Sequence, residues 1–124
     1  MTQTYRLPYS KTTLEFSLPP DMRAEVAISK PVPPLIDVPA AIQAALDHPV
    51  GCAQLRELAK PGDRACIVFT DITRASPDHL LVPALLRELE KAGVRDEDIT
   101  LLCGIGMHRP STQAEKVTKL GAEI

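Results

Sequence analysis

The sequence predicts an α/β fold, in which an N-terminal β-hairpin precedes a Rossmann-like β-α-β-α unit with parallel strands. Residues 65–70 (ACIVFT) and 99–103 (ITLLC) are near-continuous apolar runs, which are typical of strands buried on both faces of a sheet. Between them, residues 78–91 place leucines along one stripe at helical spacing. A strand, a helix and a second strand joined in this order form a right-handed crossover, so we expect the two strands to be parallel.

Residues 1–37 are predicted to form the hairpin and a proline-rich connector. Residues 13–18 (TLEFSL) and 24–29 (AEVAIS) alternate polar and apolar side chains, as strands do, and PPD between them is a turn signal. The segment KPVPPLIDVP contains too much proline for a helix or a central strand. We therefore expect residues 38–124 to form the α/β unit that bears the site loops, and residues 1–124 to be a single α/β domain or a fragment of one.

Local signals set the ends of the predicted helices. Four helices are expected, at residues 39–45, 53–59 and 78–91 and from residue 112 onward. The last begins at Thr112, where TQAE fits a capping box. Ser76 is expected to cap the third helix, with Pro77 at its first position, and Gly93 to end it in a left-handed conformation. Pro83 predicts a kink, because proline costs about 3 kcal/mol inside a regular helix.

Composition excludes several classes of partner. Lysine and arginine number 14 and aspartate and glutamate 16, a net charge of −2 with no basic run, and only four residues are aromatic. A nucleic-acid partner is therefore not expected. The chain has no run of about 18 apolar residues and no apolar leader core, so we expect a soluble, cytoplasmic protein with no membrane partner. Three cysteines without a C-x-x-C spacing predict neither a disulfide framework nor a zinc site.

The polar residues that could carry chemistry follow the two predicted strands. The loops are residues 71–77 (DITRASP) and 104–110 (GIGMHRP), and parallel strands end at the same edge of a sheet. The side chains expected to converge there are Asp71, Thr73, Arg74, His108 and Arg109. Each loop leads into a helix N-terminus, which attracts anions, and the arginines add fixed positive charge. Because His108 can move a proton near neutral pH, the loops predict a site for an anionic small molecule with a proton to be abstracted.

Simpler interpretations of the same residues remain open. An aspartate directly after a strand, such as Asp71, is often a turn residue that accepts backbone N–H groups. Arg74 is also compatible with a solvated loop residue, and His108 with an incidental histidine in a glycine-rich loop. Gly104 and Gly106 do not form a dinucleotide fingerprint, because Arg109 occupies the position of its third glycine.

Three stretches, taken together, resemble the N-terminal part of the nickel-dependent lactate racemase family. They are Leu7-Pro8-Tyr9, Asp71-Ile72-Thr73-Arg74, and the run from Gly104 to Thr112 (GIGMHRPST), in this order and at this separation. The resemblance covers essentially the whole chain but only the beginning of a family member. It implies two α/β domains around a cleft that holds a nickel-pincer pyridinium mononucleotide. The resemblance also implies a reaction in which the cofactor takes a hydride from the α-carbon of a 2-hydroxy acid and returns it to either face.

The motif match implies roles for individual residues. His108 matches a histidine that donates and accepts the substrate proton. The residues implied to contact the nucleotide are Asp71, Ile72, Thr73 and Arg74. Arg109 is our candidate for binding the substrate, and no metal ligand is expected in this chain. The resemblance places the cofactor lysine, the nickel histidine and a second catalytic histidine beyond Ile124, in a C-terminal part of the enzyme. Ala75 departs from the proline frequent in the family, so the loop is expected to be less rigid.

Two further interpretations compete with an enzyme domain that is inactive as this fragment. The chain could be a stand-alone α/β module that binds a nucleotide or a carboxylate without catalysis, or a purely structural or assembly domain. His108 discriminates between the enzyme domain and the binding module, because only an enzyme requires a proton carrier at that position.

Overall fold

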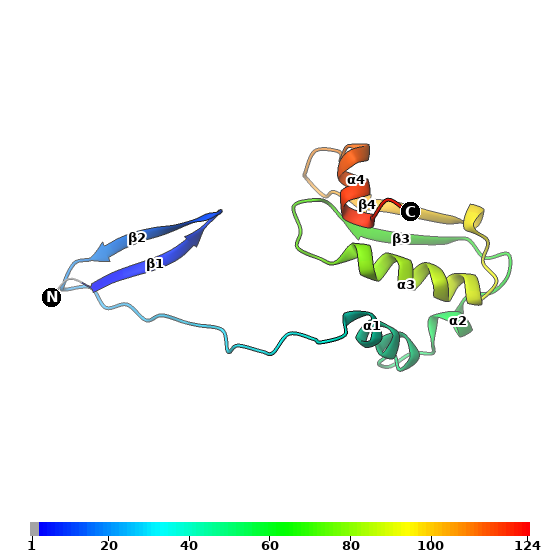
Figure 1. Cartoon of the computed structure of the whole chain (residues 1–124), viewed down its shortest axis with the longest axis horizontal. Helices are drawn as coiled ribbons and strands as arrows, with labels where there is room; N and C mark the ends of the chain where they lie inside the picture. Colours follow the sequence, from blue (N-terminus) through cyan, green and yellow to red (C-terminus); the bar gives the residue numbers. More distant parts are fainter. Residues whose placement is uncertain (1–2) are drawn as a thin grey trace. The chain divides into compact units, whose positions relative to one another are not determined.

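The computed structural model describes residues 3–124 and divides after Pro34 into an N-terminal unit and a larger second unit (Figure 1). Strands β1 (Gln3–Tyr9) and β2 (Thr12–Leu18) form an antiparallel hairpin in the first unit. The predicted hairpin is thus present, and its strand at residues 13–18 is confirmed as β2, but the other strand was assigned wrongly. Residues 24–29 form no strand, and β2 pairs instead with the segment before it.

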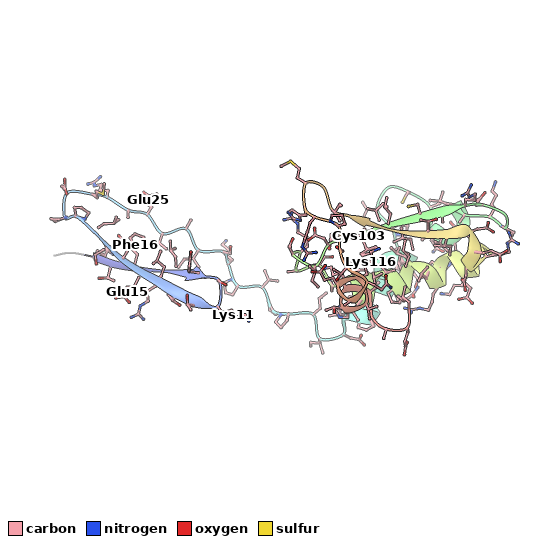
Figure 2. The ribbon with its side chains drawn as sticks, turned by 90° about the horizontal axis from the view of Figure 1, so that it is seen from above. Lys11, Glu15, Phe16, Glu25, Cys103 and Lys116 are labelled. Atoms are coloured by element: carbon pink, nitrogen blue, oxygen red, sulfur yellow. The ribbon has the colours of Figure 1, made fainter. Side chains whose placement is uncertain are left out.

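The turn and the cross-strand pairs explain this pairing. Ser10 turns the chain at φ 54°, directly between the two strands. Tyr5 stacks on Phe16, with 5.7 Å between ring centroids, and Arg6 pairs with Glu15 at 2.8 Å. Phe16 and its neighbour Glu15 point to opposite faces of β2 (Figure 2). The aromatic pair and the ion pair therefore stabilise opposite faces of the same hairpin.

The second unit contains the parallel sheet. Its elements are α1 (Val38–Asp47), α2 (Leu55–Leu58), β3 (Ala65–Thr70), α3 (Asp78–Lys91), the short 3-10 helix η1 (Asp96–Asp98), β4 (Ile99–Gly104) and α4 (Gln113–Leu120). Strands β3 and β4 pair in parallel, from Ala65 opposite Ile99 to Thr70 opposite Gly104. The predicted β-α-β-α order and the parallel strands are confirmed.

The core lies on the face of the sheet that α3 covers. Helix α3 packs against β3 and also contacts α1, α2 and α4. Six buried residues form the core: Ile67, Phe69, Val82, Leu89, Val94 and Leu120. The prediction that both strands are buried on both faces is wrong for the described residues, because Val68 and Leu102 are 63% and 53% exposed. Alternate side chains of each strand point away from the helices, and no described element covers that face.

Two of the predicted helix ends are confirmed. Thr112 accepts from the Glu115 backbone N–H while the Glu115 carboxylate accepts from the Thr112 N–H, a complete capping box. At the end of α3, Gly93 adopts φ 83°, and the N–H groups of Gly93 and Val94 bind the carbonyls of Glu90 and Leu89. This Schellman motif requires a left-handed residue, which glycine supplies without strain.

Other helix predictions were wrong or stay open. Pro77, not Ser76, is the N-cap of α3, and Ser76 instead donates its hydroxyl to Asp78 at 2.7 Å. Helix α2 is a single turn rather than residues 53–59, and Ala59 directly after it is already extended. Pro83 lies inside an uninterrupted α3, and the kink there stays a prediction. No helix in residues 3–124 has the length and apolar character needed to cross a membrane.

Phe69 is the core position at which a substitution should most reduce stability. Its side chain is 4% exposed within the cluster that joins β3 to α3 and α4. We expect Phe69→Ala to lower the free energy of unfolding by about 3–5 kcal/mol, because the cavity left behind cannot fully collapse. Urea unfolding of residues 1–124 measures this. Val68→Ala, on the exposed face of the same strand, is the control, and an equal loss in both variants would contradict the assigned core.

Candidate functional site

The two loops predicted to converge do meet at one edge of the parallel sheet. Strands β3 and β4 end at Thr70 and Gly104, which lie opposite each other. The loop after β3 begins with Asp71, and the loop after β4 carries His108. The His108 Nδ1 atom lies 3.0 Å from Asp71 Oδ2. The topology therefore brings together two side chains that are 37 residues apart in the sequence.

Asp71 is held as a buried, ionised carboxylate. Its side chain accepts the backbone N–H of Thr73 at 2.9 Å, and the residue is 5% exposed. Hydrogen bonds from the Thr73 side chain and backbone hold the pKa of Asp71 well below its usual range, with a smaller contribution from His108 and against the effect of burial. Asp71 is thus both the turn residue of the simpler interpretation and the partner of His108.

The ionised carboxylate determines which nitrogen of His108 carries the proton. A carboxylate only accepts hydrogen bonds, so Nδ1 must be the donor in this pair. Nε2 of the neutral ring then has a free lone pair, and the side chain is 42% exposed. The pair can therefore accept a proton at Nε2, and the Asp71 charge stabilises the imidazolium ion that results.

The two arginines of the site differ in what they bind. Arg109 makes two bonds to the Glu115 carboxylate, at 2.9 and 2.6 Å, and this pairing raises the pKa of Arg109. Within residues 3–124, no carboxylate pairs with the exposed Arg74 side chain. Its neighbours Ile72 and Thr73 are exposed as well. Of the two arginines predicted to bind an anion, Arg74 is therefore the one whose charge no carboxylate of the described residues neutralises.

Sequence reasoning missed two buried charged residues beneath these loops. Asp78 is 4% exposed and Lys119 is 7% exposed, and the two lie 3.4 Å apart. Burial acts to raise the pKa of Asp78, but hydrogen bonds from Thr70 and Ser76 and the charge of Lys119 outweigh it and lower the pKa. Asp78 could have been noticed as an acid in the first turn of a helix. Lys119 has no local signal, because the sequence around it is that of an ordinary polar helix.

The pairing of Glu115 predicts an acid-sensitive contribution to stability. Hydrogen bonds from Arg109 and from the Thr112 N–H lower the pKa of Glu115 to about 2 from a usual value of 4.5. A lowered folded-state pKa stabilises the fold above pH 4.5, and that contribution is lost as pH falls toward 2.

We expect Glu115→Gln to flatten the loss of stability across this acid range, because glutamine keeps the capping bond but not the charge. Urea unfolding of both proteins at a series of pH values measures the slope. Glu90→Gln is the control, since the Glu90 side chain makes no ion pair in the described part of the chain. An unchanged slope in Glu115→Gln would contradict the assignment.

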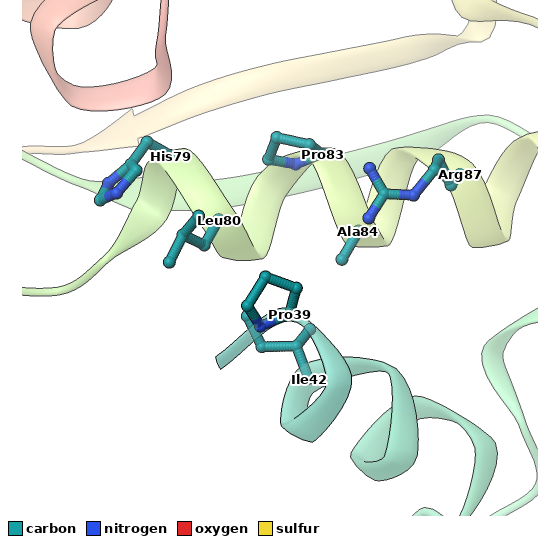
Figure 3. Close-up of a pocket in the computed structure, with 7 residues that line it drawn as sticks. All are labelled: Pro39, Ile42, His79, Leu80, Pro83, Ala84 and Arg87. Carbon is teal, nitrogen blue, oxygen red and sulfur yellow. The ribbon is translucent and has the colours of Figure 1, made fainter. Parts of the chain in front are cut away.

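A pocket of about 280 Å³ lies apart from this site, between α1 and α3 (Figure 3). Its lining residues are Pro39, Ile42, His79, Leu80, Pro83, Ala84 and Arg87. None of the predicted site residues lines it. Residues 3–124 also contain no cluster of three or more histidine, cysteine, aspartate or glutamate side chains that could hold a metal ion.

Comparison with known proteins identifies relatives of this chain. Residues 9–124 match the family described as the lactate racemase N-terminal domain. The lactate racemase of Lactiplantibacillus plantarum is 33% identical over 120 residues, which are 95% of this chain and 28% of that protein. The lactate racemase of Thermoanaerobacterium thermosaccharolyticum is 28% identical over 120 residues, with the same coverage. The structure of its apoprotein matches with a TM-score of 0.75 at 28% identity, over 98% of this chain and 28% of that one.

These matches confirm the family resemblance and the fold. The chain spans about 28% of the length of the curated relatives it matches. It belongs to the lactate racemase N-terminal domain family.

Proposed function

We propose that this chain forms the N-terminal part of a racemase or epimerase of 2-hydroxy acids, with His108 as its proton carrier. The hydrogen bond between His108 Nδ1 and the ionised Asp71 carboxylate, at 3.0 Å, is the observation on which this proposal depends. It provides a base whose Nδ1 is engaged and whose side chain is 42% exposed. The names of the relatives supply the substrate class, since both are lactate racemases.

The loop after β3 is our candidate for contacting a nickel-pincer pyridinium mononucleotide. The exposed Arg74 guanidinium suits a phosphate or carboxylate, and the Thr73 side chain and the apolar Ile72 lie beside it. When bound, the nucleotide would supply the hydride acceptor and donor at the substrate α-carbon. We propose that the cofactor lysine, the nickel histidine and the second catalytic histidine come from the C-terminal part of the enzyme.

The residues of this chain would move the proton and orient the acid. Oxidation at the α-carbon requires the hydroxyl proton to leave, and His108 Nε2 accepts it while Asp71 stabilises the imidazolium. The same nitrogen would return the proton to the enantiomer that His108 serves, and the second catalytic histidine would serve the mirror-image substrate. Although Glu115 pairs with its charge, Arg109 would bind the substrate carboxylate through the N–H groups that Glu115 and the Pro110 carbonyl leave free. Three free cysteines, two of them exposed, are compatible with a reducing compartment and support a cytoplasmic enzyme.

An isotope experiment tests the reaction type. The complete enzyme, loaded with nucleotide, is given L-lactate deuterated at the α-carbon, and chiral chromatography with mass spectrometry follows the D-lactate formed. Hydride transfer predicts that D-lactate keeps the deuterium. Loss of the label to water would indicate abstraction of the α-proton instead. No D-lactate together with nucleotide binding would favour the alternative, a module that binds a nucleotide or carboxylate without catalysis.

Arg74→Ala tests the anion-binding loop separately. We expect nucleotide binding to weaken about 10–100-fold, because a hydrogen bond to a charged group contributes about 1.5–3 kcal/mol. Isothermal titration of the complete enzyme with nicotinic acid mononucleotide, a soluble pyridinium mononucleotide, measures the affinity. Arg64→Ala, at the opposite end of β3, is the control and should bind as the wild type does. Equal affinities in all three proteins would show that the loop assignment is wrong.

A further inference from the structure

Lys119 of α4 is a buried lysine whose ammonium group binds the loop after β3. Its Nζ atom donates to the Arg74 carbonyl at 2.6 Å and to the Ser76 carbonyl at 2.8 Å. The Asp78 carboxylate lies 3.4 Å from the same atom. Two of the three N–H donors of the ammonium thus bind carbonyls, and the Asp78 carboxylate adds the opposite charge. Lys119 therefore satisfies two carbonyls of the candidate anion-binding loop, which lie 45 and 43 residues away in the sequence.

Asp78 extends this contact to the residue before Asp71. The Thr70 backbone N–H and hydroxyl donate to Asp78 Oδ2 at 3.0 and 2.6 Å, and the Ser76 hydroxyl donates to Oδ1 at 2.7 Å. Thr70 ends β3 and is followed directly by Asp71. The pair of Asp78 and Lys119 thus fixes both ends of the loop that places the Asp71 carboxylate.

The start of α4 holds the other loop. Glu115 binds the Arg109 guanidinium in the bidentate pair and accepts the Thr112 N–H at 2.8 Å. Arg109 follows His108 directly in the chain. One helix therefore contacts both loops, the first through Lys119 near its end and the second through Glu115 near its beginning.

We infer that Lys119 is a positioning residue. It holds the loop after β3, residues 71–77, so that Asp71 stays within hydrogen-bond distance of His108 and the Arg74 side chain stays exposed. The inference rests on the proposed function. A buried ion pair is a poor source of net stability compared with apolar packing. Its directional donors, by contrast, fix the geometry of the groups that they bind. Proton transfer depends on that geometry, because a displacement of about 1 Å can reduce a rate about 100-fold.

The test compares four variants of the complete enzyme. Lys119→Met removes the ammonium, Lys119→Arg keeps the charge, and Lys119→Met with Asp78→Asn removes both charges of the pair. Lys116→Met is the matched control, with the same substitution at a partly exposed position of the same helix. The first readout is the ring ¹⁵N chemical shifts of His108 in histidine-labelled enzyme, which report whether the neutral ring is protonated at Nδ1. The second is kcat and KM for lactate racemisation.

We expect Lys119→Met to lose the preference for the Nδ1–H form of His108 and to lower kcat about 10–100-fold, with a smaller change in KM. Lys119→Arg should recover most of both, and Lys116→Met should match the wild type. If Lys119→Met does not fold, the ring shifts and kcat are measured on the double variant instead, and the same changes are expected there.

Wild-type ring shifts and kcat in the folded Lys119→Met or double variant would overturn the inference. It would also be overturned if neither variant folds, because Lys119 would then be required for folding alone. A different result would contradict the proposed function, namely a wild-type enzyme that does not racemise lactate. In that case the ring shifts of His108 still test the role of Lys119.

Discussion

The complete enzyme carrying His108→Ala is expected to lose racemisation in at least one direction, by about 100- to 10,000-fold in kcat. The reason is that His108 Nε2 is the proton acceptor of the site, and Asp71 cannot replace it. Asp71 is 5% exposed, and its pKa is held far too low for it to bind a proton at neutral pH. Alanine leaves the loop backbone intact, so nucleotide affinity should remain that of the wild type.

Rates in both directions, from L-lactate and from D-lactate, provide the measurement, together with nucleotide affinity. His79→Ala is the control, because His79 lies on α3 and lines the separate pocket between α1 and α3. Unchanged rates in both directions for His108→Ala would rule out its proposed role. Loss of nucleotide binding along with activity would instead point to a part in holding the cofactor.

The sequence was sufficient to predict those parts of the fold that local patterns specify. The apolar run at residues 65–70 and the capping box at Thr112 each contain their own signal, and both lie where predicted. The approach of Asp71 to His108 was also predictable, although the two are far apart in the sequence. It follows from topology alone, since parallel neighbouring strands end at one edge.

The pairing of the hairpin strands and the exposure of one face of the parallel sheet could not be predicted from local patterns. Residues 24–29 alternate polar and apolar side chains as a strand would, yet β2 pairs with residues 3–9, to which the turn at Ser10 joins it. The exposure of Val68 depends on which elements are available to cover the second face of the sheet. An apolar strand sequence carries no information about that.

The charged pairs of the site were the least predictable part. The position of Arg109 predicted that it binds an anion. Its pairing with Glu115 could not be predicted, because that contact requires the chain to turn between the two residues. Lys119 reaches the Arg74 carbonyl across 45 residues, and such contacts arise only once the layers have packed. Side chains that bind backbone carbonyls in another element have no characteristic spacing, so the network that supports the loops had to be seen in the structure.

Asp71→Asn is expected to lower kcat about 100- to 10,000-fold while the fold and KM change little. Asparagine can still accept the Thr73 N–H through its amide oxygen, so the turn is retained. Its NH₂ group, however, can face His108 Nδ1 only as a donor, and this arrangement moves the ring proton to Nε2. The nitrogen that should accept the substrate proton is then already protonated, and the imidazolium loses its ionised partner. An amide in the equivalent place of a serine protease triad lowers kcat about 10⁴-fold for the same reason.

The variant separates orientation of the base from binding of the nucleotide. The measurements are kcat, KM, nucleotide affinity and the His108 ring ¹⁵N shifts, with Asp63→Asn as the control. Asp63 also accepts a backbone N–H within a turn, from Lys60 at 2.9 Å, but it lies before β3, at the opposite end of the strand from the site. A full loss of kcat with the Nε2–H form and intact affinity would assign Asp71 to the proton-transfer pair. Weakened affinity with a normal kcat would instead assign it to the cofactor, as the motif match alone implies. Because both carboxylate oxygens are already engaged, by Thr73 and by His108, the first outcome is the one that the geometry favours.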